Sequence, residues 1–226
     1  MTNNVEIVPA ILKQTYEEIA SEWEKVISVA QHIHIDVTDG VFAGNKSFLD
    51  IPRLADLPAS SAGDSAASRV ELHMMVETPA DYIDDIIELN PGRCIFHIEE
   101  FLGTMDLPFV YNTIGEHTSS EMGIAINPET DTALLTEYLP IVQYVLFMGY
   151  KPGFAGQDVN TEIFKKISDF HALYPAIKIA ADGHVDKETI QHYVHAGASI
   201  CCANTAIFGT GNPEENIKQL KLLAVS

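Results

Sequence analysis

The sequence predicts an α/β protein built as a single (β/α)8 TIM barrel, and three observations support this prediction. Short apolar segments of strand length alternate with segments of helical period along the 226 residues of the chain. The alternation repeats eight times, as in a closed barrel of this kind. No long linker interrupts it, so we expect residues 1–226 to form one domain. An open doubly wound sheet is the alternative architecture.

The strands are predicted from apolar runs bounded by polar or turn residues. Helical connections between successive strands make these strands parallel. In chain order the runs are VEIVPAIL (5–12), HIHIDV (32–37), RVELHMMV (69–76), RCIFHIE (93–99), MGIAIN (122–127), YVLFMGY (144–150), IKIAADG (177–183) and SICCAN (199–204).

The helices are predicted from apolar residues recurring every three or four positions. They are expected at 16–30, 79–89, 131–139, 160–174, 187–197 and 213–225, with a short helix after the second strand. The stretch around 104–117 is predicted to be less regular, and ANTAIFG (203–209) indicates the start of a short extra helix. A Ser/Ala-rich patch at 57–68 is expected to be a flexible surface loop.

Composition and charge limit the partners that the chain could have. A formal net charge of -19 argues against nucleic acid and anionic membranes, but not against a small anion held by backbone N–H groups. Met1–Asn4 lead directly into a strand, without the features of a signal peptide, and no apolar run reaches membrane-spanning length, so we expect a cytoplasmic protein. The three cysteines (Cys94, Cys201 and Cys202) are expected to be small buried hydrophobes rather than disulfides.

The segment HIHIDVTDG (32–40) places polar groups inside an apolar strand. His34, Asp36 and Thr38 alternate with Ile33, Ile35 and Val37, so they share one face. Buried charge requires a partner, a hydrogen bond or a metal ion, and two polar residues on one strand face require a shared explanation.

Active sites of such barrels lie at the carboxyl ends of the strands. His73 on the third strand and Asp182 on the seventh fall there, together with His34 and Asp36. Two imidazoles and two carboxylates would suit a divalent cation of borderline softness. The alternative is that the histidines are hydrogen-bonded core residues. His97 is expected to be structural or to hydrogen-bond a ligand from outside.

Three loops after late strands point to a phosphate site. KPGFAGQ (151–157), ADGHV (181–185) and ANTAIFG (203–209) follow strands six to eight, where such barrels commonly bind phosphate. The alternative is that their Gly and Pro residues only mark turns.

These segments resemble the ribulose-phosphate 3-epimerase family. The matching pieces occur in the family's order and extend over roughly residues 6–210: VPAIL, IHIDVTDGVF, ELHMMVETP, INPET, VLFMGYKPGFAGQ, ADGHV and TAIFG. The signatures around Asp36 and Asp182, with PGFAGQ between them, are specific to this family among phosphate-binding barrels.

The resemblance implies an isomerase of the pentose phosphate pathway that epimerises D-ribulose 5-phosphate to D-xylulose 5-phosphate at C3. His34, Asp36, His73 and Asp182 would bind one divalent ion (Zn, Fe, Mn or Co), and Asp36 and Asp182 would be the acid and base. The resemblance also implies a homo-oligomer. Further residues would bind the sugar and its phosphate: Met75, Met148, Gly153, Phe154, Ala155, Gly156, Gly183, Asn204 and Thr205.

The substrate shell departs from the family pattern, while the metal and acid–base set does not. The differences are Ala10 for Ser, Thr38 for Met, Lys151 for Asn, Ala155 for Gly, His184 for Gly and Asn204 for Gly, with Gly44, Leu49 and Asp50 in the loop after strand two. We favour an unchanged substrate, with Lys151 or His184 compensating at the phosphate. The alternative is another ketose phosphate, such as allulose 6-phosphate.

Two further classes of function are alternatives. A decarboxylase or aldol-type enzyme on the same barrel would have an Asp-x-Lys-x-x-Asp pattern on strand three, and ELHMMVE has no lysine. A non-catalytic phosphosugar-binding homologue would explain the altered shell, but it would not explain why all four ligand-type residues are present.

Overall fold

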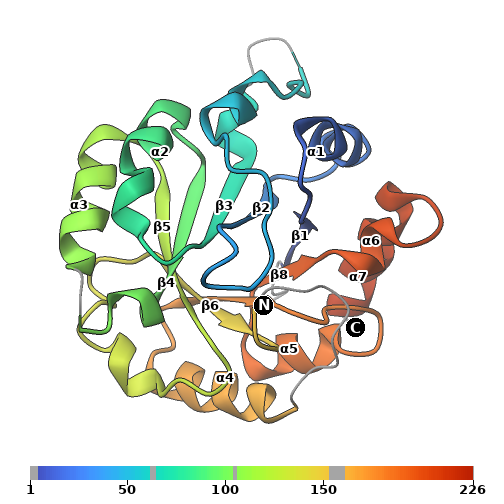
Figure 1. Ribbon diagram of the computed structural model, residues 1–226. Coiled ribbons are helices and arrows are strands. Elements are labelled where there is room, and N and C mark those ends of the chain that lie inside the picture. Colours follow the sequence, from blue (N-terminus) through green and yellow to red (C-terminus); the bar gives the residue numbers. More distant parts are fainter. Residues whose placement is uncertain (1–4, 62–64, 104–105, 153–160, 226) are drawn as a thin grey trace.

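The eight strands pair in chain order into one closed barrel (Figure 1). The computed structural model describes residues 5–61, 65–103, 106–152 and 161–225. The strands are β1 (Glu6–Ile11), β2 (Ile33–Thr38), β3 (Val70–Met75), β4 (Arg93–His97), β5 (Glu121–Ile126), β6 (Tyr144–Met148), β7 (Lys178–Asp182) and β8 (Ile200–Ala203). All neighbouring pairs are parallel, and β8 pairs with β1 to close the sheet. The predicted barrel is confirmed and the open sheet is excluded.

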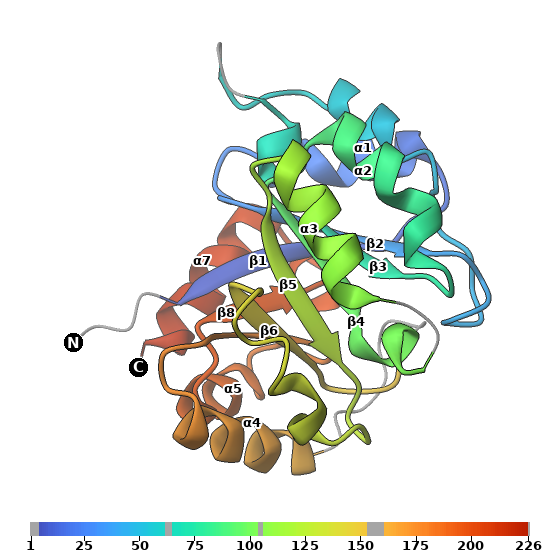
Figure 2. The ribbon, with the colours of Figure 1, turned by 90° about the vertical axis from the view of Figure 1, so that its left-hand side faces the viewer.

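Helices cover the outside of the barrel in a ring (Figures 1 and 2). They are α1 (Tyr16–Trp23), α2 (Ile83–Leu89), α3 (Leu107–His117), α4 (Glu162–Leu173), α5 (Ile190–Ala196), α6 (Thr205–Phe208) and α7 (Pro213–Ala224). Short 3-10 helices occur at η1 (Pro52–Asp56), η2 (Ala67–Arg69), η3 (Pro79–Tyr82), η4 (Ile98–Phe101) and η5 (Thr132–Leu135). The short extra helix after strand eight is confirmed as α6.

Local signals explain where several helices start. Thr15 and Glu18 form a reciprocal capping box at the start of α1, which satisfies N–H groups that the helix leaves unpaired. Asn212 caps α7 by accepting from Glu215 N, and Pro213 occupies its first turn, where no N–H donor is needed.

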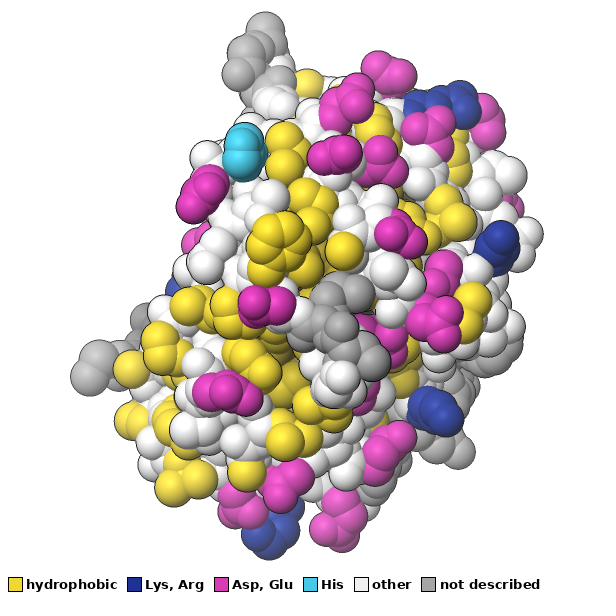
Figure 3. All heavy atoms as spheres, turned by 60° about the vertical axis from the view of Figure 1, so that its left-hand side comes forward, with side chains coloured by type: hydrophobic (Ala, Val, Ile, Leu, Met, Phe, Trp, Pro, Cys, Tyr) yellow, Lys and Arg dark blue, Asp and Glu magenta, His cyan; other side chains and the backbone are white. Residues whose placement is uncertain are grey.

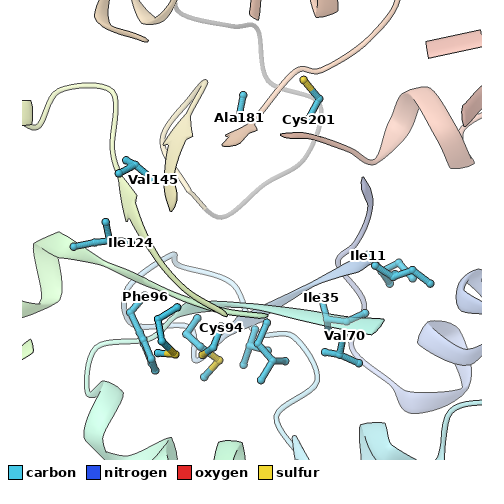
Figure 4. Packing of buried hydrophobic residues seen from close by; sticks show 14 of the residues in the cluster. Ile11, Ile35, Val70, Cys94, Phe96, Ile124, Val145, Ala181 and Cys201 are labelled. Atoms are coloured by element: carbon cyan, nitrogen blue, oxygen red, sulfur yellow. The ribbon is translucent and has the colours of Figure 1, made fainter. Parts of the chain in front are cut away.

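Alternate residues along the strands face two different cores. One set faces the helices, and Figure 4 shows members of it from all eight strands: Ile11, Ile35, Val70, Cys94, Phe96, Ile124, Val145, Ala181 and Cys201. The other set fills the barrel interior and includes Val8, Ile95, Tyr144, Leu146 and Cys202. All three cysteines are buried and free, as predicted.

The stretch around 104–117 was predicted to be less regular than the other connections, and this prediction was wrong for residues 107–117. Leu107–His117 is the helix α3, so His117 ends a helix rather than lying in a loop. Asp106 accepts from Phe109 N as the N-cap, and buried Val110 and Ile114 face the barrel. Pro108 lies in the first turn, where proline is tolerated.

Other connections are less helical than their periodicity suggested. The predicted helix 131–139 is only the 3-10 turn η5, and the predicted helix 16–30 ends as α1 at Trp23 and continues in turns. Pro140 lies just after the 131–139 segment and cannot continue a helix. The 57–68 patch is not wholly a surface loop, because Ala66 and Ala67 are buried.

Acidic residues outnumber basic ones, with 32 Asp and Glu against 13 Lys and Arg, which gives the chain its net negative charge. Figure 3 shows one face on which Asp and Glu side chains are widely spread and Lys and Arg are few. Within the part of the chain that the structure describes, none of the helices combines the length and apolarity needed to cross a bilayer.

Candidate active site and metal centre

Four polar side chains from three strands meet at the carboxyl end of the barrel. His34 and Asp36 come from β2, His73 from β3 and Asp182 from β7. Each offers a ligand atom, and these atoms all lie within 4.8 Å of one another. The structure therefore brings together the four residues that the sequence predicted to converge.

Strand register explains this convergence. Asp36 pairs with His73 across β2 and β3, so the two side chains lie at the same height. His73 Nδ1 lies 2.9 Å from Asp36 Oδ1 and 4.0 Å from Asp182 Oδ2. Strands β8 and β1 separate β7 from β2, so Asp182 approaches Asp36 from across the barrel mouth.

The pKa values of Asp36 and Asp182 are shifted in opposite directions. Burial alone would raise the pKa of Asp36, but His34 and His73 beside it lower that pKa well below its usual range. Burial and the charge of Asp36 raise the pKa of Asp182 to about 7. Two adjacent, partly buried carboxylates favour a proton or a cation between them. The N2O2 donor set fits a divalent metal ion of the zinc type.

A buried ion pair lies behind His34, and sequence reasoning missed it. Glu71 Oε1 is 2.6 Å from His34 Nδ1, and Glu71 Oε2 accepts from Arg93 Nη1 at 3.0 Å. Burial would raise the pKa of Glu71, but His34 and Arg93 lower it to about 2. The period of two on β3 could have revealed Glu71, which shares a strand face with His73.

His97 contacts His73, one of the four converging residues, on the side away from the site, and the sequence analysis expected either a structural role or a hydrogen bond of this kind. Its Nε2 lies 2.9 Å from His73 Nε2, and its Nδ1 lies 3.2 Å from Glu99 Oε2. Burial and the neighbouring imidazoles of His34 and His97 lower the pKa of His73 to about 4, although Asp36 opposes this shift. His73 is therefore neutral at pH 7, as a metal ligand must be.

Buried side chains surround the cluster formed by His34, Asp36, His73 and Asp182. Met75, at the end of β3, pairs in register with Thr38 of β2, and Met148 pairs with Asp182. Both methionines are buried. The Thr38 hydroxyl is also buried and has no hydrogen-bond partner among the described residues. Ser47 accepts from Thr38 N and donates to the Asp36 carbonyl, which fastens the following loop to β2.

A cavity of about 340 Å³ extends from Asp182 towards α6. Its lining includes Tyr150, His184, Asn204 and Thr205, and no Lys or Arg among the described residues. His184 has a φ of 54°, in the left-handed region that favours glycine, and its Nε2 lies 3.2 Å from Asp186 Oδ2.

Two of the predicted substrate residues contact each other. Asn204 donates from its side-chain amide to the backbone carbonyl of Ala10 at 2.7 Å. Gly153, Phe154, Ala155 and Gly156 lie outside the described residues.

Gly183 packs against Gly149 at the ends of β7 and β6. Gly149 N donates to the Asp182 carbonyl at 2.6 Å, and Tyr193 donates to the Gly183 carbonyl at 2.7 Å. A Cβ on Gly149 would lie 2.3 Å from both Gly183 O and Tyr193 Oη. The φ of 109° at Gly183 also favours glycine. This contact holds the backbone of Asp182 in place.

Comparison with known proteins identifies relatives over nearly the whole chain. A model of the ribulose-phosphate 3 epimerase family matches residues 6–208. Ribulose-phosphate 3-epimerase of Candida glabrata is 31% identical over 227 residues, covering 95% of this chain and 90% of that protein. The enzyme of the same name from Eremothecium gossypii is 29% identical over 225 residues, covering 95% and 91%.

Solved structures share the fold at much lower identity. KGPDC from Streptococcus mutans matches with a TM-score of 0.71 at 7% identity, over 97% of each chain. A 3-hexulose-6-phosphate synthase matches with a TM-score of 0.68 at 14% identity, over 96% of this chain and 99% of that one. These two likenesses concern the fold alone.

Proposed function

Because the chain belongs to the ribulose-phosphate 3-epimerase family and is an isomerase, we propose that it epimerises D-ribulose 5-phosphate to D-xylulose 5-phosphate at C3. We propose that residues 1–226 act as one domain, in the cytoplasm and as a homo-oligomer. The substrate is a small sugar phosphate, which agrees with a net charge of -19 that disfavours nucleic acid and anionic membranes as partners.

The observation that carries the proposal is the pairing of Asp36 and Asp182 across the barrel mouth. Epimerisation removes a proton from one face of C3 and returns one to the other face. An ionised Asp36 can act as the base, while Asp182, with its pKa raised to about 7, can hold a proton to donate. The two roles exchange when the reaction runs in the other direction.

One divalent cation is proposed to be held by His34, Asp36, His73 and Asp182, whose donor atoms converge within 4.8 Å. When bound, it would supply positive charge to the substrate oxygens as the C3 proton leaves. Zn, Fe, Mn and Co all accept such a donor set.

The surrounding residues are proposed to position the sugar phosphate. Buried Met75 and Met148 give an apolar wall that excludes water from the planar intermediate. Gly183, His184, Asn204 and Thr205, with the loop containing Gly153, Phe154, Ala155 and Gly156, would hold the phosphate. The cavity has no described Lys or Arg in its lining, so backbone N–H groups and the His184 imidazole are the proposed donors.

The experiment that tests this proposal is solvent-proton exchange. Protein stripped with a chelator and reloaded separately with Zn²⁺, Fe²⁺, Mn²⁺ or Co²⁺ is incubated with D-ribulose 5-phosphate in deuterium oxide. Deuterium incorporation at C3 and formation of D-xylulose 5-phosphate are expected. Absence of both with every metal would refute the proposal.

A changed substrate is the second candidate. The Thr38 hydroxyl, which has no hydrogen-bond partner among the described residues, and the Asn204–Ala10 hydrogen bond favour it, because both would alter the substrate shell. Faster C3 exchange with allulose 6-phosphate than with ribulose 5-phosphate would establish this candidate. Tight sugar-phosphate binding without exchange would instead indicate a non-catalytic homologue.

A further inference from the structure

The two candidate histidine ligands present different ring nitrogens to the site. His34 Nε2 lies 3.2 Å from Asp36 Oδ1, whereas in His73 it is Nδ1 that lies 2.9 Å from the same oxygen. The other nitrogen of His34, Nδ1, lies 2.6 Å from Glu71 Oε1. The other nitrogen of His73, Nε2, lies 2.9 Å from His97 Nε2. Each imidazole therefore has one nitrogen on the site and one on a buried partner.

Glu71 is a buried carboxylate with both oxygens engaged. The whole residue is 0% exposed, and its second oxygen pairs with Arg93 Nη1 at 3.0 Å. An acceptor-only carboxylate requires His34 Nδ1 to carry the proton and donate it. With Nδ1 committed to Glu71, Nε2, which lies on the side of Asp36, is the nitrogen of His34 that can give a lone pair to a cation.

The pairing with Arg93 does not by itself explain Glu71. Arg93 also contacts Glu6 at 2.9 Å and Glu121 at 3.2 Å, so its single charge faces three carboxylates. Glu71 is the one of the three that is fully buried. Arg93 offsets the charge of Glu71, but this charge must also be shared with Glu6 and Glu121. The presence of a fully buried carboxylate at position 71 therefore needs a second explanation.

His73 is linked to a carboxylate, that of Glu99, through an intervening histidine, His97. Glu99 Oε2 lies 3.2 Å from His97 Nδ1, and Glu99 Oε1 accepts from Asn127 N at 2.9 Å. The carboxylate assigns the proton of His97 to Nδ1, so His97 Nε2 accepts from His73 Nε2. With Nε2 committed to His97, Nδ1, which lies beside Asp36, is the nitrogen of His73 that can give a lone pair to a cation.

We propose that Glu71 and His97 are positioning residues, which fix Nε2 of His34 and Nδ1 of His73 as the donors to the cation. Partners of this kind orient a ligating imidazole, and a charged acceptor makes it a stronger donor. Glu71 places a full negative charge directly on His34, whereas His97 is a neutral acceptor, so Glu71 has the larger effect on metal affinity. The inference rests on the metal centre of the proposed function.

The test measures binding of Co²⁺ alone to chelator-stripped protein, followed by calorimetry and by the visible absorption of the bound ion. Glu71→Gln keeps an acceptor oxygen but removes its charge, and it is expected to weaken the Kd by roughly 10- to 100-fold and to alter the absorption. Glu121→Gln is the matched control, because it removes a carboxylate from Arg93 without touching His34. Its Kd is expected to equal that of the unmodified protein.

A double variant tests whether a loss of metal affinity in Glu71→Gln arises from misfolding. Glu71→Gln leaves Arg93 less compensated, whereas Glu71→Gln with Arg93→Met removes both buried charges. The double variant is expected to show the same loss of affinity with a native circular dichroism spectrum. In the Zn²⁺-loaded protein, NMR of the ring nitrogens is expected to show a protonated Nδ1 in His34 and a protonated Nε2 in His73.

The outcomes separate the two proposals. Unchanged Co²⁺ affinity in folded Glu71→Gln, or the opposite tautomers in the NMR spectra, would overturn the positioning role alone. An unmodified chain that binds no Co²⁺ and no Zn²⁺ would overturn the metal centre and this inference together.

Discussion

The side-chain amide of Asn204 donates a 2.7 Å hydrogen bond to the backbone carbonyl of Ala10. These are two of the positions at which the resemblance to the family implies a different residue. The bond joins the end of β1 to the residue that precedes α6, beside the last strand pair of the barrel. At position 204 the unusual side chain therefore takes part in barrel closure.

Replacing Asn204 by Ala should lower the free energy of unfolding. The hydrogen bond is part-buried, and its loss is expected to cost about 1 kcal/mol. Urea denaturation followed by circular dichroism measures this change. Asn112→Ala, on the exposed face of α3, is the control and should not destabilise the protein. Equal midpoints for Asn204→Ala and the unmodified chain would contradict the structural role.

Asp36→Asn and Asp182→Asn should each abolish most of the activity. Asparagine keeps the shape of the side chain but cannot exchange a proton as a carboxyl group does. A loss of roughly 10²- to 10⁴-fold in kcat is expected from general acid–base catalysis alone. Steady-state epimerisation and C3 exchange in deuterium oxide measure the effect. Near-normal turnover in either folded variant would rule that aspartate out as an acid–base group.

Metal removal should destabilise the folded chain as well as inactivate it. A cation that binds only the folded state stabilises it by about 2.7 kcal/mol at a free concentration of 100 times its Kd. The Tm is expected to fall on adding a chelator and to recover with excess Zn²⁺ or Co²⁺. His117→Gln, at the end of α3, should show the same metal dependence. A Tm that changes neither on adding a chelator nor on adding metal would argue against the proposed site.

Glu100 should make stability depend on pH. Burial and the charges of Glu77, Asp39 and Glu99 raise its pKa from 4.5 to about 7. Between these pH values the folded chain binds more protons than the unfolded chain, so the free energy of unfolding falls as pH rises. Because the group is partly exposed and screened, Glu100→Gln should gain only about 1 kcal/mol at pH 8. At pH 4 the gain should vanish, and denaturant titrations at the two pH values test this difference.

Thr38→Val should stabilise the free protein. The hydroxyl is buried without a partner among the described residues, and valine has the same shape without the polar atom. A gain of about 1 kcal/mol is expected, because an unsatisfied hydroxyl is costly to bury. Thermal unfolding without substrate measures it. A lower Tm would indicate that the hydroxyl is hydrogen-bonded in solution.

The alternation of strands and helices predicted the barrel because the period of each element is set by local geometry. The barrel rule then placed His34, His73 and Asp182 at one rim, and the structure brings them together with Asp36. The period of two places Glu71 on the same strand face as His73, but its contact with His34 depends on the register between β2 and β3, which the pattern of either strand alone does not reveal. The helix α3 was missed because its start depends on the cap at Asp106 rather than on a long periodic pattern.

The contact between Gly149 and Gly183 has a consequence for how the chain can diversify. A methyl group at Gly149 would collide with backbone and Tyr193, so this junction of the rim tolerates no side chain. Variation in substrate range, whether natural or by directed evolution, must therefore be accommodated elsewhere around the mouth. Position 38, one of the positions at which the resemblance implies a difference from the family, lies on β2 away from this contact, so a library built there would leave Gly149 and Gly183 unchanged.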